Sequence, residues 1–468
     1  MENLYFSLRH IDRTTERHFC YFQVIHYKLN PFIFIKMYSG KKNSDPERPG
    51  AIYLTICKFA VPLTLTVLLL LTGCRNRPAT IKENQADPVT IRTTTLQSEV
   101  KTGLSENRAD KQHESPEATI NIGLMVSSQV SKSELARAAS HGAELAVNQA
   151  NEAGGYNNSR FRLLVRSCDG PWGVAAKQAV SLITEYDIKA LLTSLDGRNA
   201  HLIEQVATKT KVLMLSARSA DPTLSQAFVP WYYRCVPDDN QQAEALADEL
   251  FKNRRLNNLT VVSENSYDGR LASGIFLKKL EEMHAEIPER LFYDELKPDF
   301  NGLIEQIKKT GINNIVLFGG PGNVLGIIKL LAEQGREQNL YGPFSVMGEE
   351  KTLEEFWNYT DNMVLTSPGI WFTPGGKKFQ EAYKKAWGYF PGPAAACSYD
   401  GMNMLLETIR QRGREQEEMV DYLGKIKYEG VTGIIQFDER GNRKGKPGLM
   451  KIKDGFPVYL GRPDQVFK

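Results

Sequence analysis

Two short loops combine small residues with arginine and aspartate side chains. They run from Ser194 to Asn199 and from Ser216 to Asp221, and each follows an apolar run that predicts a buried strand. In open parallel sheets, ligands bind beyond the carboxyl ends of the strands, where loops and helix N-termini present free backbone N–H groups. A guanidinium placed there can hold a carboxylate through two parallel hydrogen bonds. Arg198 and Arg218 therefore favour noncovalent capture of a carboxylate-bearing solute.

The two arginines also have an alternative interpretation. Each could lie on the outer surface of its loop in solvent, or pair with Asp196 or Asp221, and would then contribute little. The sequence leaves both interpretations open.

Motifs for catalysis, cofactors and metals are missing from the sequence. It contains no G-x-S-x-G, Walker A or H-E-x-x-H motif, and His141, His201 and His284 are too scattered for a metal site or a catalytic triad. The glycines at 319–322 lack the third glycine of a dinucleotide loop, because Leu325 stands in its place. We expect a protein that is not an enzyme and needs no cofactor and no metal.

The charge balance of the chain bears on whether nucleic acid is a partner. The 468 residues include 58 Lys and Arg against 55 Asp and Glu, so the overall charge gives no reason to bind nucleic acid.

The part of the chain that is expected to fold contains an odd number of cysteines, Cys168, Cys235 and Cys397. Each lies in or beside an apolar stretch. We expect three buried thiols, with one disulfide and a spare thiol as the alternative.

The N-terminal part has the layout of an export signal. An apolar run from Phe59 to Leu71 follows basic residues and is shorter than the ~20 residues of a membrane-spanning helix. It ends in Leu71-Thr72-Gly73-Cys74, which resembles the lipobox of bacterial lipoproteins. That resemblance implies cleavage before Cys74 and lipidation of its thiol.

Three segments therefore precede the folded part. Residues 1–36 are expected to be an upstream extension outside the fold, and residues 37–73 the lipoprotein signal peptide, because Met37 gives a signal of more ordinary length. Residues 74–118 contain few large apolar residues and are expected to be a flexible linker.

The remaining sequence alternates short apolar runs with amphipathic segments, a pattern typical of βαβ units and parallel sheets. We predict strands at 120–126, 161–165, 190–193, 212–215, 259–262, 315–318 and 344–347. We predict helices from Gly142 to Ala153 and at 174–185, 202–208, 241–252, 269–283, 300–309 and 324–334.

The length of this part, ~350 residues, exceeds what one hydrophobic core usually holds, so two lobes are expected. The fold class is α/β, with two doubly wound parallel-sheet lobes joined by three hinge crossings. The crossings are expected after Val236, near residues 366–373 and near Gly433. This places 119–236 and 373–433 in lobe 1, and 237–372 and 434–468 in lobe 2.

Several segments carry a family resemblance. They are GAELAVNQANEAGG (142–155), Asp169, SARSADPTL (216–224), YRCVPDDNQQAEALA (233–247), the Tyr267 segment, Asp299-Phe300, SYDG (398–401) and GVTGIIQFDERGNR (430–443). In this order they resemble the type I periplasmic binding proteins of the branched-chain (Leu/Ile/Val) amino acid class. The resemblance implies the three-crossing architecture and a ligand held between the lobes.

Site residues follow from the resemblance. In that family the two loops hold the ligand's α-carboxylate, and Gly197, Ser219 and the neighbouring Ala220 fall at or near such positions. Arg198 and Arg218 depart from the small neutral residues usual there, which indicates a ligand with extra negative charge.

The second lobe is expected to complete the site. Tyr267 falls where the family closes an aromatic ring over the ligand, and Glu350 falls where a carboxylate binds the ligand's ammonium group. Alternatively, Glu349 or Glu350 lies at a helix start and interacts with its dipole. The first loop has Ser131 to Leu135 where the family often has an aromatic residue.

The resemblance implies a monomeric, lipid-anchored solute-binding protein of an ABC transporter, in the periplasm or on the outer face of the cell membrane. An amino acid or similar polar solute would draw the lobes together, and ABC permease subunits would receive it. The alternatives are a ligand-free envelope adaptor or activator and a sensory receptor component.

Overall fold

The computed structural model describes residues 119–461, apart from 172, 336 and 337, and four short strands nearer the N-terminus. The chain divides into two compact units, Met1–Arg108 and Ala109–Lys468. In the first unit, four strands pair antiparallel in sequence order: β1 (Asn3–Leu8), β2 (His18–His26), β3 (Ile33–Lys41) and β4 (Ile52–Thr55). Cys74, the end of the expected signal peptide and the expected linker lie outside the described residues.

The first lobe contains a five-stranded parallel sheet in the order β6-β5-β7-β8-β9. Its strands are β5 (Thr119–Val126), β6 (Arg160–Ser167), β7 (Leu191–Ser194), β8 (Met214–Ser216) and β9 (Tyr232–Arg234). The helices between them are α2 (Glu134–Glu152), α3 (Val174–Thr184), α4 (Gly197–Thr210) and the 3₁₀ turn η1 (Pro222–Ser225). The central strands are buried on both faces, as expected for a parallel sheet covered by helices.

The second lobe contains a seven-stranded sheet in the order β11-β10-β12-β13-β14-β17-β18. Five strands run parallel: β10 (Thr260–Glu264), β11 (Glu289–Tyr293), β12 (Asn314–Phe318), β13 (Asn339–Gly342) and β14 (Val364–Thr366). The final hairpin, β17 (Leu449–Lys453) and β18 (Phe456–Leu460), adds antiparallel to β14. The helical elements of this lobe are α5 (Asp239–Ala247), η2 (Asp248–Asn253), α6 (Tyr267–Glu282), α7 (Phe300–Thr310), α8 (Pro321–Glu333), η3 (Phe344–Val346) and α9 (Glu350–Tyr359).

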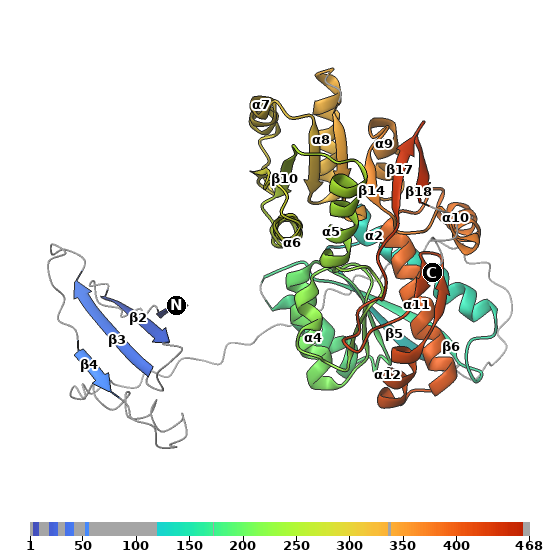
Figure 1. Cartoon of the computed structure of the whole chain (residues 1–468). Helices are drawn as coiled ribbons and strands as arrows, with labels where there is room; N and C mark the ends of the chain where they lie inside the picture. Colours follow the sequence, from blue (N-terminus) through green and yellow to red (C-terminus); the bar gives the residue numbers. More distant parts are fainter. Residues whose placement is uncertain are drawn as a thin grey trace, which may run out of the picture. The chain divides into compact units, whose positions relative to one another are not determined.

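The chain crosses between the lobes three times, which confirms the predicted architecture (Figure 1). It leaves the first lobe between β9 and α5, and it returns between β14 and α10 (Pro374–Trp387). Helix α11 (Pro393–Arg412) then packs along α2, followed by α12 (Gln416–Lys425) and the hairpin of β15 (Tyr428–Gly430) and β16 (Gly433–Ile435). Asn442 still bridges to Arg234 of β9, so the third crossing lies between 443 and 449, beyond Gly433.

One predicted strand is wrong. The apolar run from Phe344 to Met347 forms η3, and the strand lies earlier, at β13. Pro343 stands between them, and proline has no N–H to donate to a sheet ladder. The Phe344 N–H instead donates to Thr366 Oγ1 at 2.8 Å. The run therefore fills the core as a turn.

The cysteine prediction is confirmed, since Cys168, Cys235 and Cys397 are buried and unpaired. No helix within the described part of the chain is both long and apolar enough to cross a membrane.

Candidate functional site

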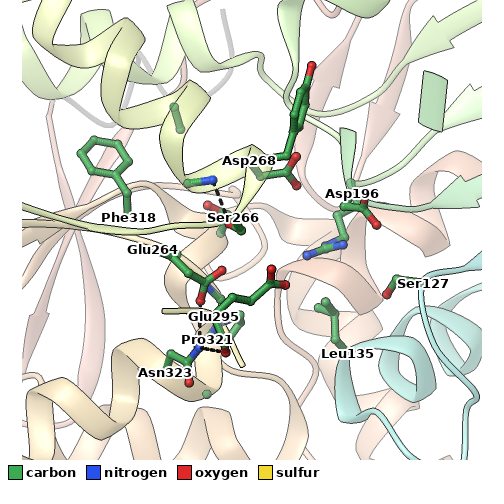
Figure 2. Close-up of a pocket in the computed structure, with 18 of the residues that line it drawn as sticks. Ser127, Leu135, Asp196, Glu264, Ser266, Asp268, Glu295, Phe318, Pro321 and Asn323 are labelled. Atoms are coloured by element: carbon green, nitrogen blue, oxygen red, sulfur yellow. Dashed lines mark hydrogen bonds between the residues drawn. The ribbon is translucent and has the colours of Figure 1, made fainter. Parts of the chain in front are cut away.

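A cleft of about 670 Å³ opens where the carboxyl ends of the strands in both lobes meet. First-lobe lining comes from the loops after β5, β7 and β8. Second-lobe lining comes from the segments after β10, β11, β12 and β13, including the N-terminus of α6 (Figure 2). The lining carries eight carboxylates against two guanidinium groups, and the carboxylates belong to Glu134, Asp196, Asp221, Asp239, Glu264, Asp268, Glu295 and Glu349.

The two arginines predicted from the sequence both line this cleft. Neither makes a hydrogen bond to the described residues, although Arg218 lies near the Asp268 carboxylate and Arg198 near that of Glu295. Asp196 is engaged as the N-cap of α4 and accepts a hydrogen bond from the Asn199 N–H at 3.0 Å. The guanidinium groups thus retain donors for a bound anion.

The other predicted first-lobe residues lie at or behind the cleft surface. Ala220 lines the cleft, whereas Gly197 and Ser219 are buried beside it. The Ser219 hydroxyl finds no hydrogen-bond partner within the described residues. The Gly197 N–H donates to Asp268 Oδ1 of the second lobe at 2.9 Å. Gly197 therefore joins the lobes.

Tyr267 also connects the lobes. It is the first residue of α6, and its hydroxyl donates to Asp221 Oδ2 at 2.8 Å. His201 Nε2 lies 3.0 Å from the same oxygen, and this hydrogen bond, helped by Glu204, raises the pKa of His201 to about 9. Burial of Asp221 acts in the other direction, but the hydrogen bonds from His201, Thr223 and Tyr267 outweigh it and lower the pKa of Asp221 to about 2.

Three further carboxylates of the cleft lining, Asp239, Asp268 and Glu295, have few positively charged groups near them. Burial, and then the nearby charge of Asp268, raises the pKa of Asp239 well above its usual range. Burial likewise raises the pKa of Asp268 despite Arg218, and burial together with Glu264 raises that of Glu295. Figure 2 shows Asp268, Glu264, Glu295 and Asp196 arranged around the same hollow. Burial thus favours the protonated form of these three carboxyl groups, and a cationic partner in the cleft would favour their ionised form.

Glu350 lies away from the cleft lining, contrary to the expectation that it binds a ligand ammonium. Its fully buried carboxylate contacts Arg137 Nε at 2.8 Å, His141 Nδ1 at 2.7 Å and the Tyr383 hydroxyl at 2.8 Å. These contacts, foremost that of His141, overcome burial and lower the pKa of Glu350. The alternative of a helix start describes this residue, since Glu350 begins α9.

Glu349 reaches the cleft instead. It caps α9, and its carboxylate accepts backbone N–H groups at the N-terminus of α11 in the other lobe, from Ala394 at 2.6 Å and Gly392 at 3.1 Å. Burial nonetheless raises the pKa of Glu349 to about 8. Its backbone partners leave it little capacity for a ligand.

Sequence reasoning missed Asp239, Asp268 and Glu264 as lining residues. A local signal existed for two of them, because Glu264 ends β10 and Asp268 lies in the first turn of α6, where the strand-end rule places ligand contacts. Asp239 lies at a lobe crossing, so no strand-end pattern marks it. Within the described residues, no group of three or more His, Cys, Asp or Glu side chains could hold a metal ion.

A family model described as periplasmic binding protein matches residues 119–454. The Leu/Ile/Val-binding protein homolog 1 of Brucella melitensis is 24% identical over 335 residues, covering 67% of this chain and 84% of that protein. The leucine-, isoleucine-, valine-, threonine- and alanine-binding protein of Pseudomonas aeruginosa is 22% identical over 308 residues, covering 65% of this chain and 81% of that protein.

Solved structures agree on the fold. A leucine-binding protein from Thermotoga maritima superposes with a TM-score of 0.64 at 20% identity, covering 74% of this chain and 99% of that one. A solute-binding protein of an ABC transporter from R. palustris, in complex with benzoate, superposes with a TM-score of 0.67 at 16% identity, covering 74% of this chain and 96% of that one.

Proposed function

This chain belongs to the periplasmic binding protein family, and on that premise we propose that it is the solute-binding component of an ABC transporter. It captures an amino acid or a similar small polar solute between its two lobes and delivers the solute to the permease. The names of its relatives support this proposal, since they describe binding of leucine, isoleucine, valine and other small amino acids.

The observation that carries the proposal is the pair of arginines in the cleft. Arg198 lies in the first turn of α4, after β7, and Arg218 in the loop after β8, and neither makes a hydrogen bond to the described residues. A guanidinium that keeps its donors free in a cleft is suited to a ligand carboxylate. Tyr267 and Gly197 join the lobes beside these loops, so a solute there would contact both lobes only when they close.

We place the protein outside the cytoplasm, anchored by lipid on Cys74. Support comes from the lipobox sequence and the preceding apolar run. Expression in a bacterial host with a radiolabelled fatty acid tests the anchor. Wild-type chain should carry label and sediment with membranes, while a Cys74→Ala variant should carry none. Label retained in that variant would contradict the anchor.

Thermal unfolding against a panel of amino acids and aromatic carboxylates tests solute binding. A true ligand should raise Tm steadily with its concentration, because it binds the folded state alone. Silence across the panel would favour the alternative, a ligand-free adaptor that uses the same fold.

A further inference from the structure

The charges lining the cleft go beyond what a neutral amino acid requires. Eight carboxylates face two guanidinium groups, and no lysine or histidine belongs to the lining. The α-carboxylate and α-ammonium of a zwitterion add no net charge, so a neutral amino acid would leave the excess uncompensated. Burying uncompensated charge on closure of the lobes is costly.

Not all eight carboxylates are available to a ligand. Asp196 and Glu349 accept backbone N–H groups at helix N-termini, and Asp221 accepts hydrogen bonds from His201 and Tyr267. Glu134 accepts the Lys351 N–H at 2.9 Å, and Glu264 accepts from Asn323 Nδ2 at 2.9 Å. These five are held by the protein's own donors.

Asp239 differs from these five. The residue is 8% exposed and lines the cleft, and its side chain makes no hydrogen bond to any described residue. The positive charge acting on it is that of Arg234, whose guanidinium donates to the Asp221 carbonyl and lies 3.8 Å from the Asp238 carboxylate. Asp239 is thus a largely buried acceptor in the cleft lining, with the hydrogen-bonding capacity of its carboxylate unused.

Asp268 and Glu295 extend this free negative charge. Asp268 accepts one hydrogen bond, from the Gly197 N–H, and the Glu295 side chain accepts none from the described residues. Burial first, and neighbouring carboxylates after it, raise the pKa of each of the three, so their ionised forms lack compensation in the free protein. A ligand with two cationic groups would supply that partner.

We propose that the solute is a dibasic amino acid, with its carboxylate on Arg198 and Arg218 and its two cationic groups on Asp239, Asp268 and Glu295. This inference rests on the proposed function and narrows its ligand class. It also reverses the expectation that the arginines indicate extra negative charge in the ligand, because free carboxylates outnumber them.

Calorimetric titration of the full chain in mild detergent tests the inference with a matched pair of ligands. L-arginine and L-citrulline have nearly the same shape, but citrulline lacks the side-chain charge. Arginine should bind about tenfold more tightly or better, as expected for hydrogen bonds between charged groups. L-leucine should bind more weakly than arginine, and L-glutamate weakest of all.

Variants then test whether Asp239 contacts the side-chain cation of the ligand. Asp239→Asn should weaken arginine binding about tenfold and leave citrulline binding nearly unchanged. Glu333→Gln is the matched control, since Glu333 is an exposed carboxylate at the end of α8 and should affect neither ligand. Equal weakening of both ligands by Asp239→Asn would overturn the charge contact.

The outcomes separate the two proposals. Leucine or citrulline binding as tightly as arginine would overturn the dibasic ligand and leave the solute-binding function standing. Failure of every amino acid and aromatic carboxylate to bind would overturn both proposals together.

Discussion

A single methyl group at Gly197 should test closure of the two lobes. A Cβ built on this residue would lie 2.8 Å from Tyr267 Cε1 and 2.9 Å from Asp268 Oδ1, both in the second lobe. It would also lie 3.0 Å from Asp221 Oδ2 in its own lobe. A real Cβ essentially never approaches other atoms this closely, so in a Gly197→Ala variant either the Tyr267 and Asp268 side chains move away or α6 and the first-lobe loop separate.

The size of the effect follows from overpacking. Inserting a methyl group into a filled contact costs about 1–3 kcal/mol. If closure alone carries this cost, the apparent Kd rises by roughly 5- to 150-fold, since ~1.4 kcal/mol corresponds to a factor of ten. The open form avoids the two contacts with the second lobe. Alanine also restricts the unfolded chain, so Tm of the ligand-free protein should not fall.

Calorimetry with the amino acid that gives the largest thermal shift measures the Kd, and small-angle scattering measures the radius of gyration. Gly274→Ala is the control, because its added Cβ would meet only Arg290 Nη1, at an ordinary 3.8 Å. An unchanged Kd and radius of gyration in Gly197→Ala would refute the approach of α6 to this loop. A large fall in Tm without ligand would place the clash within the first lobe.

Tyr267→Phe removes the hydrogen bond to Asp221. Calorimetry should show solute binding about fivefold weaker, within the usual contribution of one hydrogen bond. Unchanged affinity would argue against a role of Tyr267 in closure. Arg218→Gln loses the charge that holds a carboxylate and should weaken binding about tenfold or more, with no change in ligand-free Tm; full retention of affinity would place the carboxylate elsewhere. His201 has a pKa raised to about 9, so its stabilising contribution is complete below its unfolded value of 6.5 and is lost as pH rises through about 9. His201→Gln should therefore flatten urea-unfolding stability between pH 6.5 and 9, and an unchanged slope would contradict the pairing with Asp221, whose lowered pKa of about 2 confines its own loss of stability to acid pH.

Much of the fold was predicted from local patterns of apolar and polar residues. Strands β5, β6, β7 and β12 lie within two residues of their predicted bounds, because each contains a run of apolar residues followed by a helical period. The error at residues 344–347 came from the same rule, which cannot distinguish a buried turn from a buried strand when a proline precedes it. The short strands β15 to β18 carry no such run and were not predicted.

Some residues of the candidate site were likewise predictable from the sequence and others were not. Arg198, Arg218, Ala220 and Tyr267 were found because they directly follow strands, where a parallel sheet places its ligand contacts. The sequence could not show which of Glu349 and Glu350 lines the cleft. Glu349 is an N-cap with extended backbone and Glu350 has a positive φ of 45°, so regular helical spacing does not apply to them: Glu349 lines the cleft, whereas Glu350 faces Arg137 and its neighbours.

The order of apolar and polar residues along the chain was sufficient by itself to predict the α/β class and the strand-end loops, because each depends on neighbours within a few residues. Tertiary structure alone decided which charges share the cleft. Asp239 comes from a lobe crossing, Asp268 from the start of α6 and Glu295 from the loop after β11, and their separation in sequence conceals that they face one space. Electrostatic repulsion acts through that space, so the ligand charge that we propose depends on how the lobes pack.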